Sequence, residues 1–112
     1  GTSETSYGRQ VMKNAWSVYT KEEYCSLADY GYRILVEAIT ARETYSITCP
    51  VLLLCGERDH AGSAKRYNRN WAKFEGYKLC WITDAGHNSN TDSPEQVNNL
   101  IELFVGELSS EI

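Results

Sequence analysis

The stretch Cys-Pro-Val-Leu-Leu-Leu-Cys-Gly-Glu-Arg-Asp, residues 49–59, decides the fold predicted for this chain of 112 residues. Its centre, Val51 to Cys55, is continuously apolar rather than alternating. A strand has this composition when both of its faces are covered, as in a parallel sheet under helices. The strand is expected to end in the turn that follows, which leaves Asp59 at its carboxyl end.

The residues downstream repeat this strand-and-helix pattern. A helix is predicted next, and its apolar face comprises Ala64, Tyr67, Trp71 and Phe74. Gly76 is a suitable stop for that helix. A second strand, again nearly all apolar, is predicted over residues 77–83, and it ends in Asp-Ala-Gly-His, residues 84–87. The alternation favours a parallel sheet layered by helices.

A final helix is the best-marked element of the sequence. Ser93 is expected to cap it, Pro94 suits its first position, and Gln96 would complete a capping box. Its apolar stripe comprises Val97, Leu100, Ile101, Phe104, Val105 and Leu108. This stripe is expected to pack against the strands.

The first part of the chain, residues 1–44, is predicted to be a helical segment that precedes the sheet. Thr20 and Glu23 have the spacing of a capping box, and a helical apolar pattern follows them. Gly31 weakens the middle of that pattern, so it indicates either one helix or two. The predicted fold class is therefore α/β, with the strand–helix–strand–helix unit in residues 45–112.

Composition and charge narrow the classes of function. The net charge is -4, which does not suggest nucleic acid or an anionic membrane as a partner. The longest apolar run, residues 51–55, is far too short to span a bilayer. The chain begins Gly-Thr-Ser-Glu without an initiator Met or a signal segment, which indicates a tag remnant or a piece of something longer.

The four cysteines, at positions 25, 49, 55 and 80, have neither disulfide nor zinc spacing. We expect them to be reduced, as in a cytoplasmic protein, and we expect no metal or cofactor.

Asp59 and His87 are the candidate catalytic residues. Each follows a predicted strand at its carboxyl end, where ligands bind in parallel sheets, and 28 positions separate them. Neighbouring parallel strands would bring the two side chains within hydrogen-bonding reach. A carboxylate in that place fixes the imidazole tautomer and stabilises the imidazolium, and a general base of this kind serves acyl transfer.

Three motifs in this order resemble those of the α/β-hydrolase family. Residues 49–59 resemble its penultimate strand and acid turn, residues 84–87 its histidine loop, and residues 92–104 its final helix. The resemblance covers about residues 45–105. It implies that Asp59 is the triad acid, that His87 is the triad base, and that the chain is the C-terminal portion of such a fold preceded by the end of a cap.

The sequence departs from the family at the nucleophile. The family's G-x-S-x-G element is absent, because no serine of the chain lies between glycines at that spacing. The resemblance then implies a parent enzyme that cleaves an ester, amide or similar bond of a small molecule. The missing N-terminal part of the same protein would supply the nucleophile, and the chain alone would be inactive. The alternative is a non-catalytic module that binds a partner or a small molecule.

Other polar residues near the predicted site have simpler interpretations. Asp84 and Asp92 are rival acids, but Asp84 need not face the ring and Asp92 is interpreted as part of helix initiation. His60 is interpreted as loop surface. The basic residues between 65 and 73 indicate a solvated helix face.

One edge of the predicted sheet has no partner in the sequence. The strand at residues 51–55 carries none of the devices that protect a natural edge, such as Lys or Pro. We therefore expect the chain to form a homodimer through this edge, unless residues 1–44 fold over it.

Overall fold

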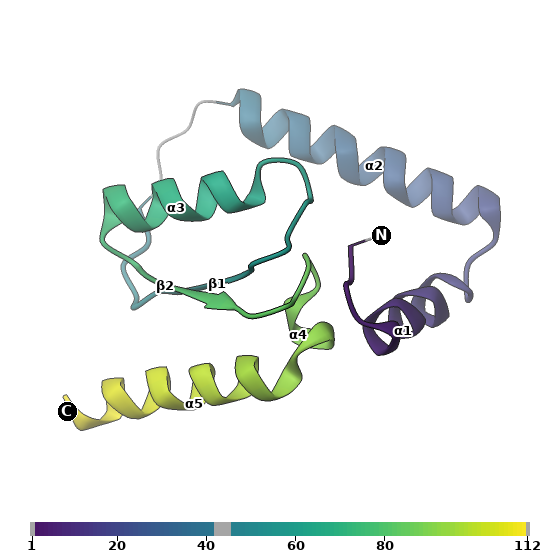
Figure 1. Ribbon diagram of the computed structural model, residues 1–112. Coiled ribbons are helices and arrows are strands. Elements are labelled where there is room, and N and C mark those ends of the chain that lie inside the picture. The colour runs from purple at the N-terminus through teal and green to yellow at the C-terminus, as the bar shows by residue number, and fades with distance from the viewer. Residues whose placement is uncertain (1, 42–45, 112) are drawn as a thin grey trace.

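The computed structural model describes residues 2–41 and 46–111 of the chain. Figure 1 shows their arrangement. The elements are α1 (Ser6–Trp16), α2 (Lys21–Thr40), β1 (Leu52–Gly56), α3 (Ala64–Glu75), β2 (Lys78–Ile82), α4 (Ser89–Asp92) and α5 (Pro94–Ser110). Residues 42–44 end the predicted helical segment, and residue 45 begins the predicted strand–helix unit. Residues 42–45 lie outside the described residues.

The two strands pair in parallel and form the centre of the structure. Leu52 lies opposite Lys78, and the register continues to Gly56 opposite Ile82. Helices α3 and α5 lie on opposite sides of this pair (Figure 1), and both contact both strands. Strand boundaries predicted from the apolar runs differ from the observed ones by a single residue at each end.

The predicted fold class is wrong. The described residues form a small helix-rich domain with five helices and a single two-stranded sheet. They are not the portion of an α/β-hydrolase fold, with parallel strands covered by helices, that the motifs indicated. The physical reason is that only two pentapeptides of the described residues form strands, while helices occupy most of the remainder of those residues. A pair of strands is too narrow to bury its neighbours as a wide sheet would.

The buried core is correspondingly small. Its apolar members are Leu53, Cys55, Ile82, Ala85 and Val97. Leu52 and Leu54 of β1, and most of β2, are only partly buried. The continuous apolar run of β1 was expected to indicate two covered faces, but the described helices cover them incompletely.

Helices α1 and α2 contribute little to this core. Among the described residues, α1 packs on α4, and α2 has no extensive contact with another element. α2 is one continuous helix through Gly31 and contains no buried residue. A Cβ at Gly31 would meet nothing within 4 Å, so this glycine is neither a break nor a close-packing point.

Two of the three predicted helix ends are confirmed. The Thr20 hydroxyl accepts a hydrogen bond from the Glu23 N–H at 3.1 Å, and the Glu23 carboxylate accepts one from the Thr20 N–H at 2.8 Å. Gly76 ends α3 in the left-handed conformation, with φ of 72°. Both are end structures that the sequence pattern specifies locally.

The predicted capping box of the last helix is wrong. Ser93 makes no side-chain capping bond, although Pro94 does occupy the first turn of α5. The Gln96 amide instead donates to Ser93 Oγ at 2.6 Å and pairs with both backbone groups of Thr83, at 3.1 and 3.2 Å. Gln96 therefore ties α5 to the end of β2.

No helix within the described ranges has both the length and the apolar character needed to cross a membrane.

Candidate active site

The turn after β1 and the loop after β2 lie side by side, as the parallel register requires. The Glu57 N–H donates to the Ile82 carbonyl at 3.0 Å, and the Arg58 N–H donates to the Ala85 carbonyl at 2.9 Å. These bonds continue the pairing of the strands past their ends. They bring Asp59, which follows β1, to the same edge as His87, which follows β2.

Asp59 and His87 are in contact, as the strand topology predicts. His87 Nδ1 lies 2.9 Å from Asp59 Oδ2. The carboxylate side chain is only 5% exposed, whereas the imidazole is 49% exposed. The second carboxylate oxygen, Oδ1, accepts the Ala61 N–H at 2.9 Å. Both oxygens of the acid are thus engaged, and the ring projects from a fixed buried partner toward solvent.

This geometry determines which nitrogen of His87 can act as a base. A carboxylate offers only acceptors, so the Nδ1 atom facing it carries the proton in the neutral ring. Nε2 then holds the free lone pair. The arrangement has the acid–base half of a catalytic triad, in which the carboxylate orients the ring and stabilises it when it takes a proton.

Cys55 is the thiol beside this pair, and it is not suited to be a nucleophile. Its Sγ lies 3.9 Å from Asp59 Oδ2 and its residue is 2% exposed. Burial first, and then the negative charge of Asp59, raise the pKa of the Cys55 thiol. The thiol stays protonated and contacts the acid rather than the base. Its role is in packing at the end of β1.

Two glycines allow the turn and the loop to approach each other. A Cβ built at Gly56 would overlap the carbonyl oxygens of Ala85 and Gly86. A Cβ built at Gly86 would lie 2.7 Å from the Thr2 carbonyl oxygen. The histidine loop is therefore packed between the end of β1 and the N-terminal segment.

Asp84 and His60 are two further polar residues near the predicted site. Asp84 has a positive φ of 56° and its carboxylate pairs with the Arg58 guanidinium at 2.6 Å, at the surface. His60 is exposed, as its interpretation as loop surface requires. Neither residue takes part in the bond between Asp59 and His87.

Asp92 has a role that its sequence position did not indicate. It was interpreted as part of the initiation of the final helix, but its carboxylate binds other segments of the chain. It accepts hydrogen bonds from the backbone N–H groups of Glu4 (2.8 Å), Thr5 (3.2 Å) and Gly86 (2.9 Å), and from the Thr5 hydroxyl (3.0 Å). No sequence signal could have indicated these bonds, because two of the partners lie at the other end of the chain.

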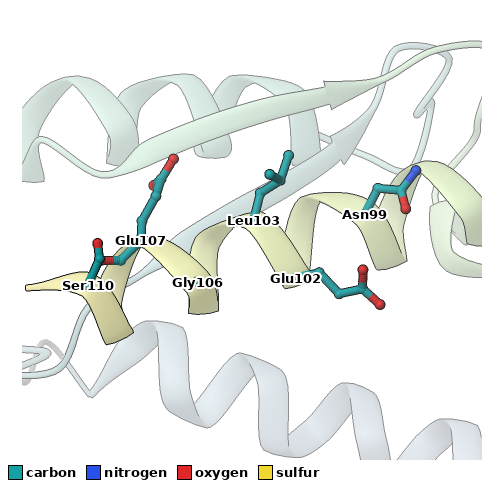
Figure 2. A pocket seen from close by; sticks show the side chains of 6 residues that line it. All are labelled: Asn99, Glu102, Leu103, Gly106, Glu107 and Ser110. Atoms are coloured by element: carbon teal, nitrogen blue, oxygen red, sulfur yellow. The ribbon is translucent and has the colours of Figure 1, made fainter.

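A surface hollow of about 650 Å³ lies along α5, and neither Asp59 nor His87 lines it. Figure 2 shows its lining side chains, all from that one helix: Asn99, Glu102, Leu103, Gly106, Glu107 and Ser110. It is an open helix face rather than a substrate pocket of the acid–base pair. Across residues 2–41 and 46–111, no three His, Cys, Asp or Glu side chains gather as they would around a metal ion.

Comparison with known proteins gives no relative: no family model, no curated protein and no solved structure matches the chain.

Proposed function

We propose that this chain supplies the acid and the base, Asp59 and His87, of a hydrolase that cleaves an ester, amide or thioester bond in a small molecule. The observation that carries the proposal is the 2.9 Å contact between a buried carboxylate and a half-exposed imidazole. In such an enzyme Nε2 of His87 takes the proton of the nucleophile and later gives it to the leaving group. Asp59 keeps the ring in the required tautomer.

The roles of the two residues draw on the resemblance of their motifs to those of α/β-hydrolases. They do not depend on the fold class, because the same constellation of nucleophile, histidine and acid occurs on unrelated folds. The nucleophile would come from a further part of the same protein. A serine is the usual residue there, and Asp or Cys serves in some members of the family.

A protein expressed from the complete coding sequence tests the proposal. Turnover of p-nitrophenyl esters is expected, and Asp59→Asn should lower kcat by roughly 10⁴-fold, because the wrong imidazole tautomer is left. His87→Gln should lower it at least as far. Asp84→Asn is the matched control, since this carboxylate pairs with Arg58 at the surface and should leave kcat close to the wild-type value. Turnover that survives both Asp59→Asn and His87→Gln would overturn the assignment.

The chain of 112 residues alone should not turn over these esters above background. It offers a base without an attacking atom and without oxyanion donors, and these supply most of the rate. The control is His87→Ala measured in parallel. Activity of the wild-type chain that disappears in this variant would show that a nucleophile on the chain had been overlooked.

The alternative, a non-catalytic module that binds a partner or a small molecule, is favoured by one observation. A hollow of about 440 Å³ between α1 and α2 is lined by exposed apolar side chains, including Trp16, Tyr24, Leu27, Tyr32 and Leu35. A complete coding sequence without a nucleophile element, together with absent turnover, would favour this alternative. For either function we propose a cytoplasmic location, since all four cysteines are free thiols.

A further inference from the structure

The carboxylate of Asp92 joins the two ends of the chain at the histidine loop. Oδ2 accepts the N–H groups of Gly86 and Glu4, and Oδ1 accepts the N–H and the hydroxyl of Thr5. The Thr5 hydroxyl in turn accepts the Gly8 N–H at 2.9 Å, which caps α1. One side chain therefore holds both the start of α1 and the peptide that precedes His87.

The other hydrogen bonds of the loop fix its two sides and leave the Gly86 peptide to be fixed by Asp92. On one side, the Ala85 carbonyl is fixed by the Arg58 N–H at the end of β1. On the other side, the Asn88 N–H donates to the Thr2 carbonyl at 3.1 Å, and the Asn88 amide donates to the Thr2 and Ser3 hydroxyls. His87 lies between these anchors, and within the loop its orientation depends on the Gly86 peptide that Asp92 holds.

Glycine at position 8 makes room for this carboxylate. A Cβ built at Gly8 would overlap Asp92 Oδ1. Gly8 is the only buried residue of α1, although it has no side chain to pack. The space that a side chain at position 8 would fill is thus occupied by the Asp92 carboxylate.

We infer that Asp92 is a positioning residue for His87, and that residues 2–8 form part of the histidine site through it. The catalytic meaning of this inference rests on the proposed function. The structural meaning, that the His87–Asp59 contact depends on Asp92, can be measured without turnover. Asp92 acts through the Gly86 peptide and does not itself contact the imidazole.

The tautomer of His87 is the readout, because a general loss of stability does not change it in the folded molecules. Long-range proton–nitrogen NMR spectra of the full chain, recorded above the range in which histidine titrates, distinguish the Nδ1–H from the Nε2–H form. The wild-type ring should be in the Nδ1–H form that the Asp59 contact requires. Asp59→Asn, which leaves the wrong tautomer, supplies the reference for a lost Nδ1–H to carboxylate bond.

Asp92→Asn should shift His87 away from the Nδ1–H form, toward the Nε2–H form that Asp59→Asn leaves. The amide loses the negative charge and one of the two acceptor oxygens that the N–H donors share. Asp84→Asn is the matched control. It makes the same chemical change three positions from His87, at a left-handed residue where asparagine is tolerated, and should leave the Nδ1–H form intact.

Gly8→Ala gives a second, independent variant in case Asp92→Asn unfolds the chain. The added methyl displaces the Asp92 carboxylate from the N-terminal side and leaves every loop residue unchanged. It should produce the same tautomer shift. Gly106→Ala is its control, because a Cβ there meets nothing within 4 Å.

The two proposals fail in different ways. If Asp59→Asn changes the tautomer while Asp92→Asn and Gly8→Ala do not, Asp92 is only a structural link and the inference is overturned. If Asp59→Asn itself leaves the tautomer unchanged, the acid–base contact is absent in solution and the proposed function falls with it. A shift in all three variants, with both controls unchanged, supports the inference.

Discussion

At the scale of single residues, Gly56 is the position where the strand end has the least room. Gly56→Ala should destabilise the chain by about 3 kcal/mol, because the methyl would overlap the carbonyls of Ala85 and Gly86 and push the loop away. Urea unfolding monitored by circular dichroism measures the change. Gly106→Ala in α5 is the control and should stabilise by about 0.5–1 kcal/mol, since alanine is the better helix former. Equal stability of the two variants would contradict the close approach.

Asp92 makes the free energy of unfolding depend on pH in the acid range. Burial alone would raise its pKa, but the N–H donors of Glu4, Gly86 and Thr5 outweigh that effect and hold the pKa below the ordinary value of 3.8. A depressed carboxyl pKa contributes stability that is complete above pH 3.8 and is lost as the pH falls through the lower folded-state pKa.

The wild-type chain should therefore exceed Asp92→Asn in stability by about 1–3 kcal/mol at neutral pH, and this gap should close in acid. Urea unfolding of both proteins across pH 7 to 2.5 gives the gap directly. Subtraction removes the titration of the other nearby groups, namely the side chains of Glu4, Asp59 and His87. A gap that stays constant down to the lowest pH would show that Asp92 is not the titrating group.

Sequence reasoning found the residues that meet through neighbouring strand ends, and it missed those that meet across the chain. Asp59 and His87 follow two adjacent parallel strands, so their contact follows from topology and is confirmed. Their catalytic roles stay predictions. The Asp92 bonds join positions up to 88 residues apart, and no repeat, motif spacing or strand pairing in the sequence predicts them.

At the scale of elements, α2 should open independently of the sheet. It has no buried residue, and a helix of 20 residues without packing is marginal in water. Its amides should exchange with deuterium far faster than those of β1, whose Leu53 and Cys55 are buried. Residue-resolved hydrogen exchange measures both. Equal protection of α2 and β1 would show that α2 is packed against something.

Thr20→Ala should accelerate exchange in α2 about fivefold, because loss of the capping box costs about 1 kcal/mol. β1 should be unaffected. Ser63→Ala is the matched control, since Ser63 precedes α3 but makes no side-chain capping bond. An effect of Ser63→Ala on α3 as large as that of Thr20→Ala on α2 would contradict this distinction.

Sequence signals for helix ends predicted the structure only where the capping bonds form within the helix itself. Thr20 with Glu23, and Gly76, need no distant partner, and both are confirmed. Ser93 and Gln96 have equally good spacing, but Gln96 finds both backbone groups of Thr83 within reach and binds them instead. A tertiary partner with two bonds outweighs a local cap with one.

At the scale of the whole molecule, the chain should self-associate. β1 pairs with β2 alone among the described residues, and large apolar side chains of α2, α3 and α5 are exposed. Burial of apolar area contributes about 25 cal/mol per Å², so a few hundred Å² suffice for a dimer. We expect antiparallel pairing of two β1 edges, and sedimentation at micromolar concentration measures the mass.

Two variants identify the surface. Leu52→Lys places a charge on the β1 edge and should yield a monomer, because lysine protects exposed edges. Leu35→Lys on α2 is the control and should leave the dimer intact. A monomeric wild-type chain would reject self-association, and dissociation by Leu35→Lys but not by Leu52→Lys would place the interface on α2.

The fold class was predicted wrongly because motifs describe segments and not the extent of a sheet. Residues 49–59 and 84–87 specify two strand ends and the contact between them. They carry no information on how many further strands are present. The described residues have two, and helices form most of the remainder.

The bonds between residues 2–5 and residues 86–92 join partners that are synthesised at different times. A ribosome makes Thr5 long before Asp92, and at about 5–20 residues per second the 87 positions between them take roughly 4 to 17 s to translate. During that interval the hydroxyl and N–H groups of the first segment have only water or transient partners. The Gly86 N–H can bond the Asp92 carboxylate only after residue 92 has emerged. A nascent chain stalled before residue 92 would contain Asp59 and His87 but would lack the carboxylate that holds the Gly86 peptide.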